Sequence, residues 1–210
     1  MNRPVRSQAT STREHILDSA VHVMSSRGLA RSTTKEIAQA AGLSEAALYR
    51  HFTDKSDMFL CVLAERLPQL VGTLQDLPAR VGKRTVRTNL EELARVALQF
   101  YDQTVPMLAA IFSEPELLAR HQEMMRTTDN DPHRATALLA TYLRAEQRVG
   151  RVRTGVDLEA AATLLIGACV ERVLMRRFAG EDGSAEADAR FSRAVVRTLL
   201  QGLAPSPATA

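Results

Sequence analysis

The sequence has no tryptophan, only two cysteines, and aromatic residues at just 4% of its 210 positions. Cys61 and Cys169 are far apart and each lies in an apolar helical context, which predicts neither a disulfide framework nor a zinc knuckle. We interpret both as buried thiols, with redox sensing by the pair as the alternative. The low aromatic content disfavours a cage of stacked rings around a cationic ligand.

Long apolar runs are also absent. No stretch reaches the about 18 uninterrupted apolar residues that cross a membrane. The N-terminus, MNRPVRSQATSTRE, carries charges and hydroxyls where a signal peptide has its apolar core. We therefore expect a cytoplasmic protein with no membrane partner. No alternation of apolar and polar residues extends beyond a few positions, which argues against strands and predicts an all-α fold.

Motifs for catalysis and metal binding are missing as well. Neither G-x-S-x-G nor H-E-x-x-H occurs, and the Gly82-Lys83 pair lacks the first glycine of a phosphate loop. The five histidines do not cluster. We expect no enzyme activity, no metal and no resident cofactor. The net charge of +3 permits an anionic partner without requiring one.

Apolar residues at spacings of three and four fill most of the chain and predict about nine helices. Ser11 and Glu14 predict a capping box at the start of the first helix, which stops at Gly28. Thr33 and Glu36 repeat the box for a short second helix.

The next elements are also expected to be helices. Gly42 suits a tight turn, and Ser44 caps a third helix with Leu43, Leu48 and Phe52 as inward anchors. Asp54 is expected to cap a long fourth helix that fades near Pro78.

A fifth helix is expected over residues 90–101, followed by a segment that Pro106 begins and Pro115 breaks. The segment PHRATALLATYLRAEQRVG predicts a seventh helix that ends at Gly150.

The two last helices differ from the others in their apolar content. Asp157 caps LEAAATLLIGACVERVLMRRF, which is apolar nearly all round until its basic end, and residues 191–199 define the final helix. A helix that is apolar on every side must be covered on every side, and the chain has too few other elements to do so. We therefore predict a homodimer through the last two helices.

The two short helices around Gly42, with a helix before and a helix after, form the pattern of a helix-turn-helix whose second helix enters the major groove. The residues expected to face outward are Glu45, Ala46, Tyr49 and Arg50. Thr33, Thr34 and Lys55 begin neighbouring helices, where backbone N–H groups favour a phosphate. Spacing alone fits equally well a structural helical hairpin.

The letters of TTKEIAQAAGLSEAALYRHFTDKSDMF, above all EIAQAAGLS, LYRHF and Lys55, closely resemble the N-terminal signature of the TetR family of bacterial transcriptional regulators. The resemblance runs from Thr12 to Phe59. It implies an all-helical homodimer with two DNA-binding heads and a larger regulatory domain that holds a small-molecule pocket. Most such proteins are repressors released by a ligand.

The resemblance implies three parts: a helix-turn-helix domain in residues 1–54 with a flexible arm in 1–10, a ligand-binding and dimerisation domain in 55–203, and a loose tail in 204–210. It implies phosphate contacts or head packing for Tyr49, His51 and Lys55, a DNA-backbone contact for Thr34, and base reading for Glu45, Ala46 and Ala47. The candidate DNA-binding residues are Thr33, Thr34, Ser44, Glu45, Ala46, Ala47, Tyr49, Arg50, His51 and Lys55.

Two positions depart from the family pattern. Ala46 stands where glycine is common, and Glu45 places a carboxylate near a polyanion, where it must accept from a cytosine amine or turn away. We therefore expect Arg50, the alanine methyls and the arm with Arg3 and Arg6 to share the specificity. The arm fits a minor-groove probe or a disordered end.

The resemblance implies an effector pocket among the fifth to eighth helices. Glu171 and Arg172 interrupt the apolar eighth helix, where burying either one unpaired is costly, so they pair across the dimer or orient a ligand. Each apolar candidate suits a protein core equally well. The pocket candidates are Phe100, Tyr101, Met107, Phe112, Met124, Met125, Tyr142, Glu171 and Arg172.

Together these features predict a regulator that binds double-stranded DNA at a palindromic operator and is released when a small molecule binds its C-terminal domain. Two alternatives remain: an architectural DNA-binding protein without an effector, and a helical enzyme that uses the C-terminal cavity. The sequence leaves open the operator, the effector, the regulated genes, and whether binding represses or activates.

Overall fold

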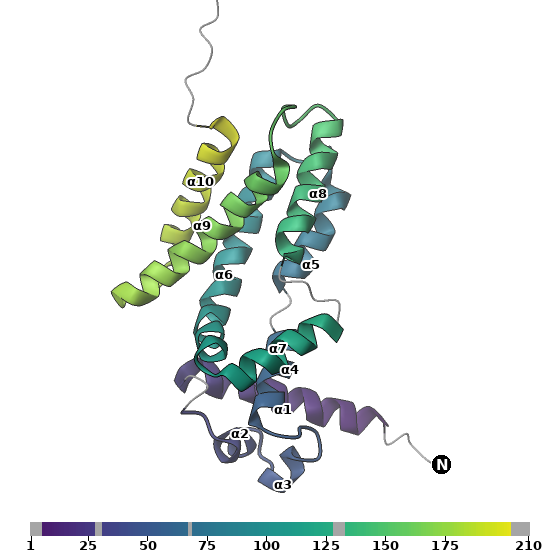
Figure 1. Ribbon diagram of the computed structural model, residues 1–210, viewed down its shortest axis with the longest axis vertical. Helices are drawn as coiled ribbons and strands as arrows, with labels where there is room; N and C mark the ends of the chain where they lie inside the picture. Colours follow the sequence, from purple (N-terminus) through teal and green to yellow (C-terminus); the bar gives the residue numbers. More distant parts are fainter. Residues whose placement is uncertain (1–5, 28–30, 67–68, 128–132, 203–210) are drawn as a thin grey trace, which may run out of the picture. The chain divides into compact units, whose positions relative to one another are not determined.

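The computed structural model describes residues 6–27, 31–66, 69–127 and 133–202, and every regular element in these ranges is a helix (Figure 1). The predicted all-α fold is confirmed. The chain divides into two compact units, the first made of residues 1–68 with 103–130 and the second of 69–102 with 131–210. The functional division into a head and a regulatory domain stays a prediction.

The first unit contains the predicted head. Its helices are α1 (Arg6–Arg27), α2 (Thr34–Ala40), α3 (Glu45–Leu48), α4 (Lys55–Arg66), the end of α6 (Val86–Ser113) and α7 (Pro115–Thr127). α1 packs against α2 and α4, and α2 packs against α3 (Figure 1). Their buried side chains form one apolar core, which includes Ile16, Leu17, Ala20, Ile37, Leu48, Phe52, Phe59 and Val62.

The local signals of the head are confirmed one by one. The N–H of Thr33 donates to Glu36 Oε2 at 3.0 Å, and the N–H of Glu36 donates to Thr33 Oγ1 at 3.1 Å, which completes the capping box. Gly42 has φ of +65°, in the left-handed region that favours glycine. Ser44 Oγ accepts from the N–H of Ala47 at 3.2 Å and caps α3.

The start of the first helix was predicted wrongly. α1 begins at Arg6, so Ser11 lies inside the helix and is not its cap. No glycine or proline lies between Pro4 and Gly28, so no helix-breaking residue prevents the helix from beginning before Ser11. The predicted flexible arm is therefore helical from Arg6 onward, while Arg3 and Gly28 lie outside the described residues.

The second unit is built around α8 and α9. Its helices are α5 (Gln69–Asp76), the short 3₁₀ helix η1 (Leu77–Arg80), the first part of α6, α8 (Arg134–Arg148), α9 (Leu158–Ala179) and α10 (Ala185–Gln201). α8 packs against α5 and α9, and α10 lies beside α9 (Figure 1). Asp157 Oδ1 accepts from the N–H of Ala160 at 3.0 Å, so the predicted cap of α9 is confirmed.

Two expectations about helix bounds differ from the structure. In place of one long fourth helix, the described residues contain α4, which ends at Arg66, and α5, which begins at Gln69. Leu67 and Pro68 lie outside the described residues. Conversely, Pro106 does not begin a new segment, because α6 continues through it.

The cost of Pro106 is offset by a side chain from another helix. Proline has no N–H, so the carbonyl of Asp102, four residues earlier, receives no bond from that position of α6. Arg177 Nη2 of α9 donates to this carbonyl at 2.7 Å. The Asp102 carboxylate also pairs with Arg176 at 2.7 Å, and Arg176 in turn pairs with Asp188 of α10 at 3.0 Å. This set of contacts ties α6, α9 and α10 together.

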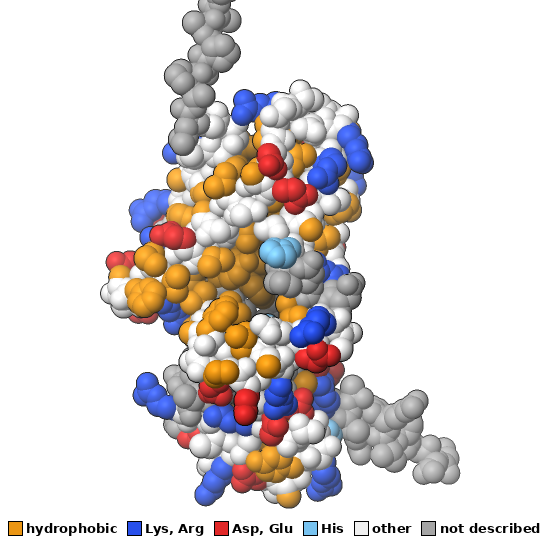
Figure 2. Space-filling model, viewed as in Figure 1, with side chains coloured by type: hydrophobic (Ala, Val, Ile, Leu, Met, Phe, Trp, Pro, Cys, Tyr) orange, Lys and Arg blue, Asp and Glu red, His pale blue; other side chains and the backbone are white. Residues whose placement is uncertain are grey.

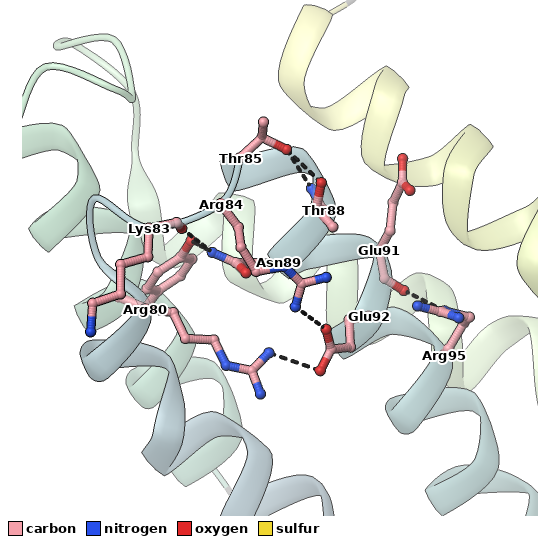
Figure 3. A network of polar contacts seen from close by, with 10 residues as sticks. Arg80, Lys83, Arg84, Thr85, Thr88, Asn89, Glu91, Glu92 and Arg95 are labelled. Atoms are coloured by element: carbon pink, nitrogen blue, oxygen red, sulfur yellow. Dashed lines mark hydrogen bonds and ion pairs between the residues drawn. The ribbon is translucent and has the colours of Figure 1, made fainter.

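The turn between η1 and α6 is fixed by a polar network (Figure 3). Arg80 and Arg84 donate to the two oxygens of Glu92 at 2.8 and 2.6 Å, and both guanidinium groups lower the pKa of that carboxyl. Asn89 Nδ2 donates to Tyr142 Oη of α8 at 2.9 Å. Tyr142 Oη donates to Glu146 Oε1 at 2.9 Å, so the network extends into the buried interior.

Neither cysteine is a reactive thiolate. Burial raises the pKa of Cys169 to about 12 and also raises the pKa of the half-buried Cys61, so both thiols are protonated at neutral pH. Within the described ranges, no group of three His, Cys, Asp or Glu side chains is placed to hold a metal ion. No helix in those ranges has the length and apolar character needed to cross a bilayer.

Candidate nucleic-acid interface

The short helix α3 packs against α2, and the segment after it is held by a contact from α1. Leu48 and Phe52 are 0% and 2% exposed and anchor it in the core. The Arg13 guanidinium of α1 lies 5.3 Å from the centroid of the Phe52 ring and donates to both oxygens of Glu65 of α4, at 2.5 and 2.6 Å. Packed side chains therefore anchor both α3 and the segment that follows it.

Three of the four side chains predicted to face outward do so, and the fourth, Glu45, is half-buried. Ala46 and Arg50 are exposed, and Tyr49 is 49% exposed although it is a large aromatic residue. Ala47 and His51 are half-buried, so they present less surface than the resemblance implies. An exposed phenol next to an exposed guanidinium and a methyl group is a surface that can meet both phosphates and base edges.

The carboxylate of Glu45 does not point freely away from the protein. Thr34 Oγ1, on the first residue of α2, donates to Glu45 Oε1. Tyr49 Oη donates to Thr34 Oγ1 at 3.3 Å. The three side chains therefore form one chain of hydrogen bonds between α2 and α3, in which Glu45 is the final acceptor.

The start of α4 carries a second polar cluster, next to the candidate phosphate-binding Lys55. Asp54 Oδ1 accepts from the N–H of Asp57 at 2.7 Å and caps the helix, as predicted. Arg120 of α7 donates to the same carboxylate at 2.9 and 3.1 Å. Burial alone acts to raise the pKa of Asp54, but the N–H of Asp57 and the guanidinium of Arg120 outweigh it and hold that pKa below its ordinary value.

No sequence pattern predicted the contact of Arg120 with Asp54, because Arg120 lies in another helix, 66 positions away. Asp57 was also missed, although a local signal for it exists. It accepts from the N–H of Thr53 at 2.8 Å, and the D-x-x-D spacing of Asp54 and Asp57 at a helix start is a recognisable capping signal.

The candidate pocket residues fall in both compact units. In the first unit, Met107 is buried, Met124 and Met125 are half-buried, and Phe112 is 73% exposed. On the same α7 helix, His121 Nδ1 is buried and finds no hydrogen-bond partner among the described residues, and burial lowers the pKa of this imidazole. His121 was not among the predicted pocket residues, since a single histidine on a helix gives no pattern.

In the second unit the candidates separate into distinct environments. The rings of Phe100 and Tyr101 meet edge to face at 5.1 Å, and burial raises the pKa of Tyr101 to about 12. Tyr142 is fully buried. Glu171 is exposed, while the Arg172 guanidinium lies 5.7 Å from the centroid of the Phe191 ring of α10. Arg172 Nε is buried, and no residue in the described part of the chain forms a hydrogen bond with it.

The last two helices leave a large apolar surface uncovered. Leu164, Met175 and Phe178 of α9 are 65%, 47% and 78% exposed. Figure 2 shows hydrophobic side chains gathered on the surface of the second unit over α9. The basic end of α9 is Arg176 and Arg177, both paired with Asp102.

Comparisons with known proteins give consistent results. Residues 16–62 match the family model of bacterial regulatory proteins, tetR family, and residues 105–202 match that of the AefR-like transcriptional repressor, C-terminal domain. The HTH-type transcriptional regulator AcrR of Shigella flexneri is 46% identical over 59 residues, which cover 28% of this chain and 27% of AcrR. The HTH-type transcriptional repressor BepR of Brucella suis biovar 1 is 30% identical over 205 residues, which cover 96% of each protein.

The fold is also found among solved structures. The transcriptional regulator FadR of Bacillus subtilis, in complex with stearoyl-CoA, superposes with a TM-score of 0.67 at 19% identity. The superposition covers 91% of this chain and 99% of FadR.

Proposed function

Because the chain belongs to the TetR family of bacterial transcriptional regulators, we propose that it binds a palindromic operator as a homodimer and leaves it when a small molecule binds its C-terminal domain. As a member of this family it is a DNA-binding transcriptional regulator, and the family consists of regulators rather than enzymes. The proposed site of action is the cytoplasm. BepR is named a repressor, which supports repression as the direction of control.

The observation that carries the proposal is the exposed surface of Ala46, Tyr49 and Arg50, next to the packed side chains that anchor α3 and the segment after it. The Arg13 contacts with Phe52 and Glu65 hold that segment in place without DNA. A surface that is already ordered loses little conformational freedom on binding. Tyr49, Arg50 and Lys55 supply phosphate-binding groups, while Ala46 leaves room for a base edge.

The proposed dimer uses the exposed apolar surface of α9 together with α10. Three large apolar side chains as exposed as Leu164, Met175 and Phe178 on one helix are unusual for a surface that stays in water. In a symmetric dimer both protomers bury their own copy of each of these side chains. Two reading helices fixed in this way match half-sites about one helical turn or a multiple of it apart.

The proposed effector is mainly apolar. In the first unit, the buried Met107 and the half-buried Met124 and Met125 are flexible apolar side chains that suit an apolar ligand and can repack around it. FadR, which has the same fold, was solved with stearoyl-CoA, and this supports a long apolar effector as the first class to test. His121 Nδ1, for which the described residues provide no partner, is a candidate contact for a polar end of the ligand.

The proposed route to the head runs through the ion pair of Arg120 and Asp54. Arg120 belongs to α7, in the part of the chain that matches the AefR-like C-terminal domain, and Asp54 caps α4 next to Lys55. A ligand that moves α7 shifts the capping residue of the helix that follows the reading helix. A shift of a few ångströms between two reading helices disfavours a fixed palindrome.

The test begins with selection of random duplexes by the purified protein, followed by titration of the recovered duplex by fluorescence anisotropy at two salt concentrations. A near-palindrome bound at nanomolar strength supports the proposal. Binding that only follows the salt concentration, with no recovered motif, supports the architectural alternative instead.

The matched variants are Tyr49→Ala and Tyr49→Phe. Tyr49→Ala should weaken binding to every duplex by about tenfold or more, since it removes the ring and the hydroxyl that are proposed to meet a phosphate. Its thermal unfolding should stay unchanged, because the side chain is half exposed. Tyr49→Phe separates the contribution of the hydroxyl. Unchanged affinity in Tyr49→Ala would contradict the placement of the DNA-binding surface.

A further inference from the structure

The hydroxyl of Thr34 has a single proton, and that proton is already used. It is donated to Glu45 Oε1, while the proton of Tyr49 Oη is donated to Thr34 Oγ1 at 3.3 Å. A DNA phosphate only accepts hydrogen bonds. Neither hydroxyl can therefore donate to a phosphate while this chain of bonds is intact.

Glu45 is also an unneutralised charge at the DNA-facing end of the head. Within the ranges that the structure describes, its carboxylate forms no ion pair with a lysine or arginine. It is half-buried between α2 and α3, beside the exposed Ala46. A phosphate that approaches Thr34 must meet this negative charge at close range.

From these two observations we propose that Glu45 is an internal competitor of DNA phosphate: its carboxylate holds the hydroxyls of Thr34 and Tyr49 closed until a phosphate displaces it. The proposal rests on the proposed DNA-binding role of Thr34 and Tyr49. Glu45 then sets the absolute affinity of the head for DNA and does not select a base. An effector can weaken DNA binding only by as much as its coupling free energy, so a lowered affinity for DNA makes release by the effector easier.

The role of competitor predicts a different result from the role of base reader. A glutamate that accepts from a cytosine amine strengthens the operator alone and sets the preference at one position. A competitor for hydroxyl protons weakens every complex that uses those hydroxyls, whatever the base sequence. The two roles therefore differ in how an affinity change is distributed between the operator and random DNA.

The decisive variant is Glu45→Gln, which keeps an acceptor oxygen of the same shape and removes the charge. We expect its affinity to rise by about tenfold, as follows from relieving repulsion of one unit charge near a protein surface. The rise should be similar for the selected operator and for a random-sequence duplex of the same length. Removal of one opposing charge should also steepen the slope of log K against log salt by about 0.9.

Two further variants make the test specific. Glu116→Gln removes the same charge from an exposed position in the first turn of α7, and its affinity should stay near that of the wild type. Thr34→Val removes the hydroxyl that Glu45 covers, so adding Glu45→Gln to it should give a smaller gain than in the wild type. Circular dichroism of each variant verifies that the helices are formed.

Three outcomes overturn the proposal. A loss of affinity confined to the operator, with a changed base preference, assigns Glu45 to base reading. A loss for all duplexes in a folded Glu45→Gln chain shows that the carboxylate holds Thr34 in its binding geometry and does not block it. An equal gain of DNA affinity in Glu116→Gln shows that the effect comes from the net charge of the protein and not from the position of Glu45. If the wild type selects no operator, the proposed function fails, while the comparison on random DNA still tests Glu45.

Discussion

Tyr142→Phe tests whether the central tyrosine of α8 belongs to the core or to a ligand pocket. The substitution removes one buried hydroxyl that donates to Glu146 Oε1 and accepts from Asn89 Nδ2, both at 2.9 Å. Removing the bond to the charged carboxylate costs about 1.5–3 kcal/mol, and removing the neutral bond about 0.5–1.5 kcal/mol. The free energy of unfolding should therefore fall by about 2–4.5 kcal/mol in total.

Two remaining contacts place the expected loss toward the lower end of that range. Asn89 Nδ2 keeps a contact with the Lys83 carbonyl at 3.4 Å, and Glu146 keeps its ion pair with Arg151 at 3.3 Å. For a chain of this size each kcal/mol lowers Tm by ~2–4 °C, so thermal unfolding followed by circular dichroism should show a decrease of roughly 5–10 °C.

The matched control is Tyr101→Phe. It deletes the same atom from a tyrosine for which the described residues provide no hydrogen-bond partner, so its Tm should change little. A decrease of Tm in Tyr142→Phe no larger than in Tyr101→Phe would refute the reasoning. Binding of an apolar effector should be unchanged in Tyr142→Phe if the hydroxyl serves only the core.

The same hydroxyl should make the stability of the protein depend on pH in alkaline solution. Burial and its neighbours raise the pKa of Tyr142 to about 12, above the ordinary value of about 10. The unfolded chain therefore loses this proton first, and the stability it contributes falls as pH rises from about 10 to about 12. The difference in unfolding free energy between the wild type and Tyr142→Phe should shrink across that interval in urea titrations.

Two other predictions concern the dimer and the head. Phe178→Glu should convert the proposed dimer to monomers in sedimentation experiments, since burying one phenylalanine is worth about 1.5–3 kcal/mol and the proposed dimer contains two; a dimer that persists in this variant would place the interface elsewhere. Because the pKa of Asp54 is held low, its pairing stabilises the fold above about pH 4 and is lost as pH falls through its lowered value. Arg120→Ala should therefore be less stable than the wild type in urea at pH 7, by at most about 1 kcal/mol for a pair this exposed, and equally stable once Asp54 is protonated; a difference that persists in strong acid would contradict this account.

The sequence predicted the features of this fold that depend on neighbouring residues. The Thr33–Glu36 box, the Gly42 turn, and the caps at Ser44 and Asp157 each involve residues within four positions of one another, so their chemistry can be recognised in a short window. The inward anchors of α3 follow from the helical period in the same way.

The contacts that the sequence did not reveal join distant segments. Arg13 and Glu65 are 52 positions apart, and Asn89 and Tyr142 are 53 apart, so no local pattern links them. The partner of Glu45 was missed for a related reason: the period places this residue outward, but a long side chain can bend back to Thr34. Pocket residues could not be separated from core residues, because both are apolar on helix faces.

The Arg177 contact with the Asp102 carbonyl has a consequence for the order of synthesis. The partner of that carbonyl is 75 positions later in the chain, so a ribosome working at ~5–20 residues per second supplies it roughly 4–15 s after Asp102. Until then the Asp102 carbonyl, four residues before Pro106, lacks its Arg177 partner and can accept only from water, so α6 gains this contact after α9 has been made. Limited proteolysis of chains truncated just before Arg176 should cut α6 readily near Pro106, and chains extended through α10 should resist.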